Sequence, residues 1–356
     1  MNAPANPLAG LRVGYAPYSP AFDRPGDRRR FAGYAARRGI RLELADPRET
    51  YDVVVLSEQA DITVWSDYTK GRVVYDLIDS YLAIPRSDLK GRLRGLAKFI
   101  AGQHRRLRLD HWRAVEAMCR RADAVVCTTL EQQRDIQPFC ANVHRVLDLH
   151  GGVARRRKTD YTAGTPFRLA WEGLAATVDS LQLIGDALRA VERTRPLALD
   201  VVTDPVSYRY LGRYGRRDTA AVLRGLCARV TLHPWNEATC ADILCGCDAA
   251  VIPLDLADPF AAGKPENKLL LLWRLGLPVV ASASPAYTRA MQAAGTNLAC
   301  VTAEDWRETL LRLIDDEALR AEAGRRGRAW AEAEFGEAQL LARWDAVFAS
   351  LFPAAA

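Results

Sequence analysis

Short apolar strands alternate with helices along almost the whole chain, and this alternation limits the fold more than any other feature. Helical segments, among them residues 27–38 and 177–192, separate the strands. The expected strands form two series, near residues 11–15, 41–44, 52–56, 72–75, 124–127 and 143–147, and again near 167–171, 197–202, 229–233 and 249–253. Strands that alternate with helices build parallel sheets from βαβ units. Each series therefore predicts one α/β domain.

The length of 356 residues is long for one hydrophobic core and natural for two domains. Residues 155–165 are basic, then rich in Gly and Thr, and have no apolar period, so they form the candidate linker. We predict an N-terminal Rossmann-like domain at residues 1–158, a C-terminal one at 159–335, and a final helix at 336–356. The N-terminus does not read as a signal peptide, and no apolar run reaches the roughly 18 residues that span a membrane. The eight cysteines lack metal spacing, which is typical of reduced thiols in a cytosolic protein.

The stretch that follows residue 262 carries the strongest functional signal. Residues 263–268, Gly-Lys-Pro-Glu-Asn-Lys, form a polar loop that opens a short apolar helix. Pro265 fits the first helical turn, and Glu266 there suits the helix dipole. Backbone N–H groups at such a helix start, with Lys264 and Lys268 beside them, make an anion site. The expected anion is a diphosphate.

The same stretch resembles the donor-binding segment of GT-B glycosyltransferases, especially family 4-like enzymes of bacterial surface polysaccharides. Those enzymes carry an Asn-Lys helix start, here Asn267-Lys268, before Gly-x-Pro-Val-Val-Ala-Ser, here residues 276–282. The resemblance implies two Rossmann-like domains whose parallel sheets face across a cleft, and a C-terminal helix that crosses back to the first domain. One departure concerns the Glu-x7-Glu pair of many retaining members, whose positions hold Gly263 and Leu271 in this chain.

The resemblance places a nucleotide-sugar donor in the second domain. Gly173 lets the backbone approach a phosphate, whereas the arginine and lysine that many relatives carry after it are missing. Lys264 and Lys268 are therefore expected to stabilise the leaving diphosphate as catalytic groups. Trp235 frames the base in relatives, but it is equally readable as a packed aromatic residue. The predicted donor-binding residues are Glu172, Gly173, Trp235, Pro253, Asp255, Gly263, Glu266 and Asn267.

Two aspartates mark the acceptor side of the first domain. Asp76 and Asp79 come at the carboxyl end of an expected strand, where open α/β sheets bind their ligands. The resembling enzymes receive the acceptor sugar at this edge, to which we also assign Tyr18. Asp79 is the candidate catalytic base that deprotonates an acceptor hydroxyl. In the alternative interpretation the aspartates only cap the next loop through backbone hydrogen bonds.

Residues 86–108 are strongly basic. Leucine and isoleucine recur there at helical spacing, at residues 89, 93, 96 and 100, between lysines and arginines. One interpretation is an interfacial helix on an anionic membrane, next to a lipid-linked acceptor. The other is a surface helix that packs its apolar face on the domain. Nucleic acid is not an expected partner, because no recognition motif accompanies the charge.

Together these features predict an enzyme that moves a sugar from a nucleotide-sugar donor to a saccharide or lipid-linked saccharide in bacterial surface-glycan synthesis. We expect it to be cytoplasmic or peripheral on the inner face of the cytoplasmic membrane. No strict Asp-x-Asp motif occurs, so no metal and no other cofactor is expected. The alternatives are a catalytically silent GT-B scaffold or binding subunit, and an NDP-sugar epimerase, for which five histidines offer few acid–base groups.

Overall fold

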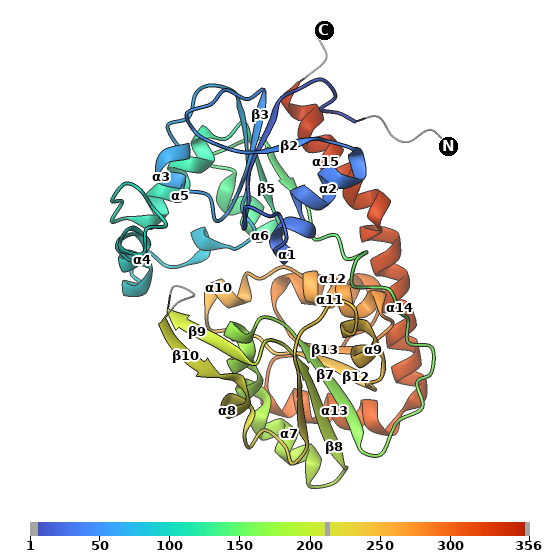
Figure 1. Cartoon of the computed structure of the whole chain (residues 1–356). Helices are drawn as coiled ribbons and strands as arrows, with labels where there is room; N and C mark the ends of the chain where they lie inside the picture. The colour runs from blue at the N-terminus through green and yellow to red at the C-terminus, as the bar shows by residue number, and fades with distance from the viewer. Residues whose placement is uncertain (1–5, 211–213, 353–356) are drawn as a thin grey trace. The chain divides into compact units, whose positions relative to one another are not determined.

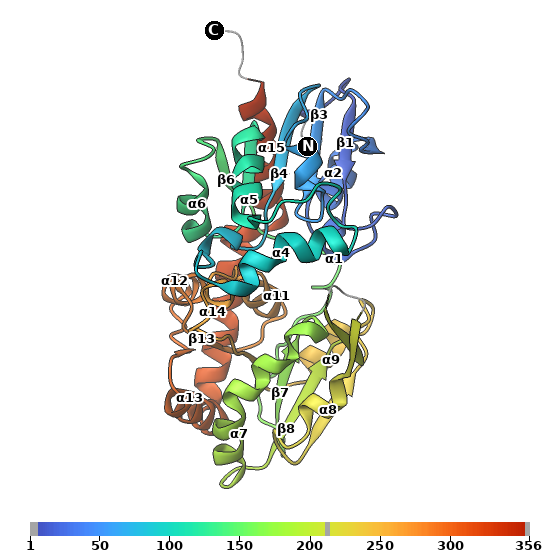
Figure 2. The same ribbon diagram turned by 90° about the vertical axis from the view of Figure 1, so that its left-hand side faces the viewer.

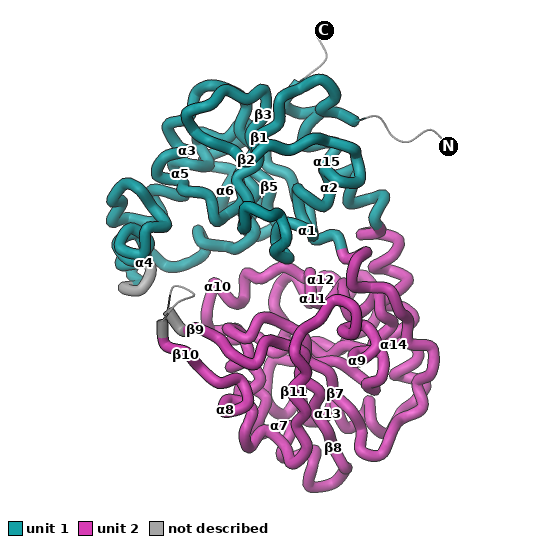
Figure 3. The backbone as a smooth tube through the Cα atoms, viewed as in Figure 1, with its two compact units in different colours: residues 1–149, 337–356 teal, residues 150–336 magenta. Residues whose placement is uncertain are grey.

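The computed structural model describes residues 6–210 and 214–352, which form two compact units (Figure 3). Unit 1 takes the chain up to Leu149 together with the residues from Glu337 onward, and unit 2 is His150–Gly336. The sequence placed the first boundary at residue 158. The segment before it lies in unit 2 because it binds there: the Lys158 N–H donates to Leu275 O at 2.7 Å.

Unit 1 is built on a parallel sheet with the strand order β2-β1-β3-β4-β5-β6. Its central strands are buried along almost their whole length, as expected of a parallel sheet covered on both faces. The strands are β1 (Val13–Ala16), β2 (Leu42–Leu44), β3 (Val53–Ser57), β4 (Arg72–Asp76), β5 (Ala124–Cys127) and β6 (Val143–Arg145). Because all of them run in the same direction, their carboxyl ends meet at one edge of the sheet.

The helices of unit 1 follow the predicted alternation, with one interruption. The expected helix 27–38 is divided into α1 and α2, because Arg30 at the break turns its buried side chain inward to Asp76. The helices are α1 (Pro25–Arg28), α2 (Phe31–Arg38), α3 (Ile62–Trp65), the 3₁₀ helix η1 (Tyr81–Ala83), α4 (Leu89–Ile100), α5 (His111–Arg121), α6 (Leu130–Ile136) and α15 (Glu337–Leu351).

Helix α15 belongs to unit 1 although it is more than 180 residues away from the rest of that unit in sequence. It lies beside α2 (Figure 1). The ring centroids of Phe31 and Trp344 are 5.7 Å apart, and those of Tyr34 and Phe348 are 5.6 Å apart. These aromatic contacts bury the apolar face of α15 inside unit 1.

Unit 2 repeats the design with the strand order β11-β8-β7-β12-β13-β14, again all parallel. An antiparallel hairpin of β9 and β10, which the sequence did not predict, follows β8. The strands are β7 (Phe167–Glu172), β8 (Leu197–Val202), β9 (Val206–Tyr210), β10 (Tyr214–Asp218), β11 (Val230–His233), β12 (Ala249–Ile252), β13 (Val279–Ser282) and β14 (Ala299–Cys300).

The expected helix 177–192 is a 3₁₀ segment followed by an α-helix. The helices of unit 2 are η2 (Ala175–Ile184), α7 (Gly185–Glu192), α8 (Thr219–Leu223), α9 (Cys240–Cys245), α10 (Pro259–Ala262), α11 (Asn267–Arg274), α12 (Pro285–Ala294), α13 (Ala303–Asp315) and α14 (Glu317–Phe335). Within the described ranges, no helix has the length and apolar character that crossing a membrane requires.

Helix α11 is the element that begins with the conspicuous polar loop. It starts at Asn267 with Glu266 as its N-cap, so Pro265 precedes the helix rather than lying in its first turn. Gly276 follows the C-cap residue Leu275 and ends the helix in the left-handed conformation, with φ of +81°. Helix α14 approaches α11 closely, since a Cβ on Gly327 would lie 2.5 Å from the Trp273 ring.

Candidate functional site

The carboxyl ends of β7, β8 and β11 are tied together in unit 2. The Thr203 hydroxyl donates to Gly173 O at 2.6 Å, and the Trp235 N–H donates to Thr203 O at 3.2 Å. The indole Nε1 of Trp235 also donates to the buried Glu172 carboxylate at 3.1 Å. Three predicted donor-binding residues, Glu172, Gly173 and Trp235, thus form one connected group at this edge.

Lys268 reaches this group from the first turn of α11. Its ammonium lies 4.7 Å from the ring centroid of Trp171, and a Cβ on Gly173 would lie 2.3 Å from its Nζ. Only glycine at position 173 therefore leaves room for the ammonium. Desolvation lowers the pKa of Lys268 to about 8, although the Glu172 charge acts in the opposite direction.

A second cation stands near the first. The charge of Lys264 contributes to lowering the pKa of Lys268, which places both ammonium groups in one local field. The ammonium of Lys264 lies 5.5 Å from the ring centroid of Phe260. In the part of the chain that the structure describes, neither ammonium has a carboxylate within ion-pair distance. Two such cations at the start of a helix favour a ligand with more than one negative charge.

The other predicted donor residues differ in their surroundings. Asp255 is exposed and accepts the Ala257 N–H at 3.0 Å, which closes a turn in the loop after β12. Pro253 is buried at the end of β12, and Gly263 is the C-cap of α10. Glu266 is buried. Burial and, to a smaller extent, the Glu266 charge raise the pKa of Tyr287 on α12, so the Glu266 carboxyl lies near that helix.

Position 271, where the resembling enzymes carry a glutamate, lies in the core. Leu271 is 1% exposed, and its neighbours on α11 from Leu269 to Trp273 are buried as well. The predicted helix start, including Asn267 at its first position, is therefore the polar end of an otherwise apolar helix.

In unit 1, Asp76 is part of a buried ion pair. Both of its carboxyl oxygens accept hydrogen bonds from Arg30, with a distance of 3.0 Å for Nε–Oδ2. Arg30 also donates to Val146 O, and its side chain is fully buried. Arg30 already occupies both carboxyl oxygens of Asp76. The position of Asp76 at the sheet edge is therefore the one remaining support for its predicted acceptor-side role.

Asp79 lies at the same edge and is half-buried. Its backbone N–H donates to Glu58 Oε2 at 3.0 Å, and its carbonyl oxygen accepts from the Gln132 side chain at 3.1 Å. Within the described residues, the carboxyl group of Asp79 has no hydrogen-bond or ion-pair partner. It remains a candidate to bind an acceptor hydroxyl.

The sequence analysis missed Glu58, which directly follows β3. It is buried, and burial together with the Asp79 charge raises its pKa to about 8. A sequence signal for Glu58 does exist, because it is an acid at the carboxyl end of a buried strand. The same pattern led to the prediction of Asp76 at the end of the neighbouring strand β4.

Tyr18 packs its ring against Gly26, where a Cβ would lie 2.6 Å from the ring. Its hydroxyl is buried and has no hydrogen-bond partner among residues 6–210 and 214–352. Burial raises the pKa of Tyr18, and the strongest charge acting on it in the same direction is that of Glu58. The predicted acceptor-side residues Tyr18 and Asp79 therefore share Glu58 as a neighbour.

Helix α4 belongs to the basic segment 86–108 and faces the viewer in Figure 2. Leu93 is 53% exposed and Ile100 is 74% exposed, so part of the expected apolar stripe is not packed on the unit. Arg105 and Arg106, just beyond the helix, are exposed as well. The side chains of residues 89–92 lie outside the described residues.

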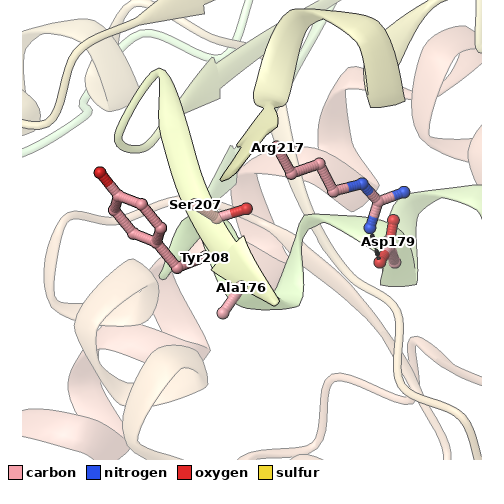
Figure 4. A pocket seen from close by; sticks show the side chains of 5 residues that line it. All are labelled: Ala176, Asp179, Ser207, Tyr208 and Arg217. Carbon is pink, nitrogen blue, oxygen red and sulfur yellow. Dashed lines mark hydrogen bonds and ion pairs between the residues drawn. The ribbon is translucent and has the colours of Figure 1, made fainter. Parts of the chain in front are cut away.

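A hollow of about 320 Å³ lies between η2 and the β9–β10 hairpin (Figure 4). Arg217 and Asp179 form an ion pair in its wall, which Ala176, Ser207 and Tyr208 also line. The charged groups of this hollow pair with each other, in contrast to Lys268.

Among the described residues no group of three His, Cys, Asp or Glu side chains could hold a metal ion.

No protein-family model matches the chain, and no curated protein is significantly similar to it in sequence. Solved structures are similar in fold. HepE from Anabaena, solved with UDP-glucose, superposes with a TM-score of 0.64 at 13% identity, covering 96% of this chain and 99% of HepE. WaaG, a glycosyltransferase involved in lipopolysaccharide biosynthesis, gives 0.57 at 14% identity over 96% of this chain and 100% of WaaG.

TarM of S. aureus, solved with UDP, superposes with a TM-score of 0.59 at 12% identity over 83% of this chain. The chain spans about half of the length of TarM, 55%. The two parallel sheets and these superpositions decide the architecture. The chain has the GT-B fold. The predicted fold class is confirmed, and in GT-B terms unit 2 carries the predicted donor residues while unit 1 carries the predicted acceptor residues.

Proposed function

We propose that the protein is a glycosyltransferase that moves a sugar from a nucleotide-sugar donor to a saccharide or lipid-linked saccharide acceptor in bacterial surface-glycan biosynthesis. The observation that carries the proposal is the ammonium of Lys268, held on Trp171 and against Gly173 without a carboxylate partner in the described part of unit 2. A diphosphate supplies the negative charge that this group lacks. The UDP and UDP-glucose bound by HepE support this choice of ligand class.

Transfer breaks the bond between the sugar and the diphosphate, and negative charge grows on the leaving oxygen. Lys264, Lys268 and the first N–H groups of α11 stabilise that charge electrostatically, which is work a metal ion does in other enzymes. We therefore propose a metal-independent reaction. The acceptor hydroxyl gives up its proton at the carboxyl edge of unit 1, around Asp79.

A thermal-shift screen tests the donor site. A ligand that binds only the folded protein raises its melting temperature, so the screen uses UDP, GDP, CMP, dTDP and ADP with their sugars. We expect a clear shift for one nucleotide that disappears in Lys268→Ala, weakens in Lys264→Ala and survives EDTA. Lys158→Ala is the matched control, because Lys158 also stacks on an aromatic ring of unit 2, Tyr161, at 5.8 Å.

The same screen separates the alternatives. A shift that Lys268→Ala leaves intact contradicts the proposed phosphate site. No shift with any nucleotide favours a scaffold or binding subunit. Donor conversion without an acceptor identifies an epimerase, whereas a transferase releases nucleotide faster when a suitable acceptor is added.

We further propose that the protein is cytoplasmic and works peripherally on the inner face of the cytoplasmic membrane, through residues 86–108. The support is the exposure of Leu93 and Ile100 on α4 beside exposed Arg105 and Arg106. Apolar side chains flanked by cations suit an anionic interface.

Flotation with phosphatidylglycerol-containing vesicles at low salt tests this contact. We expect binding that falls severalfold in Ile100→Ser and is lost at high salt. Leu183→Ser is the matched control, because Leu183 is an exposed leucine of unit 2. Equal binding of the two variants, or none by the parent protein, contradicts the membrane proposal.

A further inference from the structure

The carboxyl group of Glu58 occupies an unusual position in unit 1. Glu58 directly follows β3, and Asp79 comes three residues after the neighbouring strand β4, so both lie at the carboxyl edge of the sheet. The Asp79 N–H fixes Glu58 Oε2 at 3.0 Å. No other hydrogen bond and no ion pair to the Glu58 side chain exists within the described ranges, so Oε1 is left for a ligand.

The groups around Glu58 come from several segments of unit 1. Acting on its carboxyl or influenced by it are two acids, Asp76 and Asp79; one cation of α4, Lys98; and three tyrosines, Tyr18, Tyr75 and Tyr81. Asp76 is already paired with Arg30, and Asp79 is the charge that acts most strongly on Glu58.

Several of these neighbours have polar groups without partners. The Tyr18 hydroxyl is buried and unbonded, and the Asp79 carboxyl makes no hydrogen bond, in the described part of unit 1. The Lys98 ammonium lies 5.8 Å from the ring centroid of Tyr81 and likewise has no hydrogen-bond acceptor there. Buried polar groups are normally paired, and here a buried hydroxyl lies near two half-buried charged groups that also lack hydrogen-bond partners within the described residues. This combination indicates that a ligand rich in hydroxyl groups completes the site.

We propose that Glu58, not Asp79, is the base that receives the proton of the acceptor hydroxyl, and that Asp79 positions it. This inference rests on the proposed function. The acceptor oxygen forms a bond to the anomeric carbon, its proton passes to Glu58 Oε1, and the bond from carbon to the diphosphate oxygen breaks with its electron pair leaving on the diphosphate.

The environments of the two carboxyl groups support this division of roles. A general base works best when its pKa lies near the working pH, and paired carboxyls in different environments divide into distinct roles. Burial and the Asp79 charge raise the pKa of Glu58 to about 8. Asp79 contributes both the N–H that fixes Glu58 and the charge that increases its proton affinity.

The pH dependence of turnover tests the assignment, with UDP-glucose as donor and glucose as acceptor. For the parent protein we expect kcat/KM to rise with pH through a midpoint near 8. Glu58→Gln keeps an oxygen that accepts the Asp79 N–H, yet we expect it to lose at least ~100-fold in kcat. Asp79→Asn removes the neighbouring charge, so the midpoint moves to lower pH.

The opposite pattern overturns the assignment. If Asp79→Asn abolishes the rising limb while Glu58→Gln keeps it, Asp79 is the base. A limb that neither variant moves, or no turnover by the parent protein, also contradicts the role of Glu58. UDP binding, followed by thermal shift in the same variants, reports separately on the donor site, because Lys268 controls that binding and neither Glu58 nor Asp79 does.

Discussion

Each unit is built on its own parallel sheet, but the ionisable groups at the carboxyl edges of the two sheets are of opposite kinds, acids in unit 1 and lysines in unit 2. In unit 1 the carboxyls of Glu58 and Asp79 have no ion-pair partner among the described residues, and in unit 2 the same holds for the ammoniums of Lys264 and Lys268. Burial desolvates Glu58 and Lys268. The comparison teaches that one α/β plan sets where ligands bind, while the residues just after the strands set the charge of the ligand.

The largest expected effect comes from removing the cation that pairs with the buried acid of unit 1, Asp76. Arg30→Met leaves Asp76 buried without its bidentate partner, and breaking a buried pair costs about 3–5 kcal/mol. We expect this loss in the free energy of unfolding by urea. Arg195→Met is the control, since Arg195 pairs with Asp315 in a similar bidentate geometry but in solvent, where the cost is about 1 kcal/mol or less. Equal losses contradict the buried-pair account.

Opposite responses to pH are the second consequence. The pKa of Glu58 in the folded protein is about 8, above its ordinary value of 4.5, so the ionised carboxyl destabilises the fold. The free energy of unfolding therefore falls as the pH rises from 4.5 to 8, by roughly 1.4 kcal/mol per pH unit. The folded pKa of Lys268, about 8, lies below its ordinary 10.5, so its penalty is complete below pH 8 and is relieved as pH rises toward 10.5.

Melting temperatures across pH check this contrast. We expect Glu58→Gln to be stabilised relative to the parent protein mainly above pH 6, and Lys268→Met to be stabilised mainly below pH 9. Two variants whose differences from the parent do not change with pH contradict the proposed desolvation of these groups.

Gly173→Ala gives the smallest expected effect and tests whether the position of the Lys268 ammonium in unit 2 controls UDP affinity. The new Cβ meets the flexible end of Lys268 at 2.3 Å, so the ammonium moves while the fold is kept. Charge-assisted hydrogen bonds contribute about 1.5–3 kcal/mol, so we expect UDP affinity to fall about tenfold or more by calorimetry. Gly185→Ala, where a Cβ approaches the end of Arg189 at 3.2 Å, is the matched control with unchanged affinity.

Much of the fold could be predicted from local pattern. The strands Ala124–Cys127 and Leu197–Val202 have the predicted bounds, because short apolar runs determine them locally. The β9–β10 hairpin was missed, although Val206, Tyr208 and Tyr210 alternate with polar residues in β9 in the way typical of a strand.

The candidate site was less accessible to sequence reasoning. The lysines were recognised by their place beside a helix start, a local feature. The pairing of Arg30 with Asp76 joins residues 46 positions apart, and the bond from Asp79 to Glu58 spans 21, so neither leaves a periodic trace. The stacking of Lys268 on Trp171 depends in the same way on the tertiary fold.

The membership of α15 in unit 1 has a consequence for synthesis on the ribosome. Unit 2 is one continuous segment, His150–Gly336, and can fold as soon as that segment has emerged. Unit 1 emerges first but lacks α15, so the faces of Phe31 and Tyr34 that stack on Trp344 and Phe348 stay uncovered while unit 2 is made. The half of the molecule that is translated first is therefore completed last, and a chaperone that shields aromatic surface has its time of action between those two events.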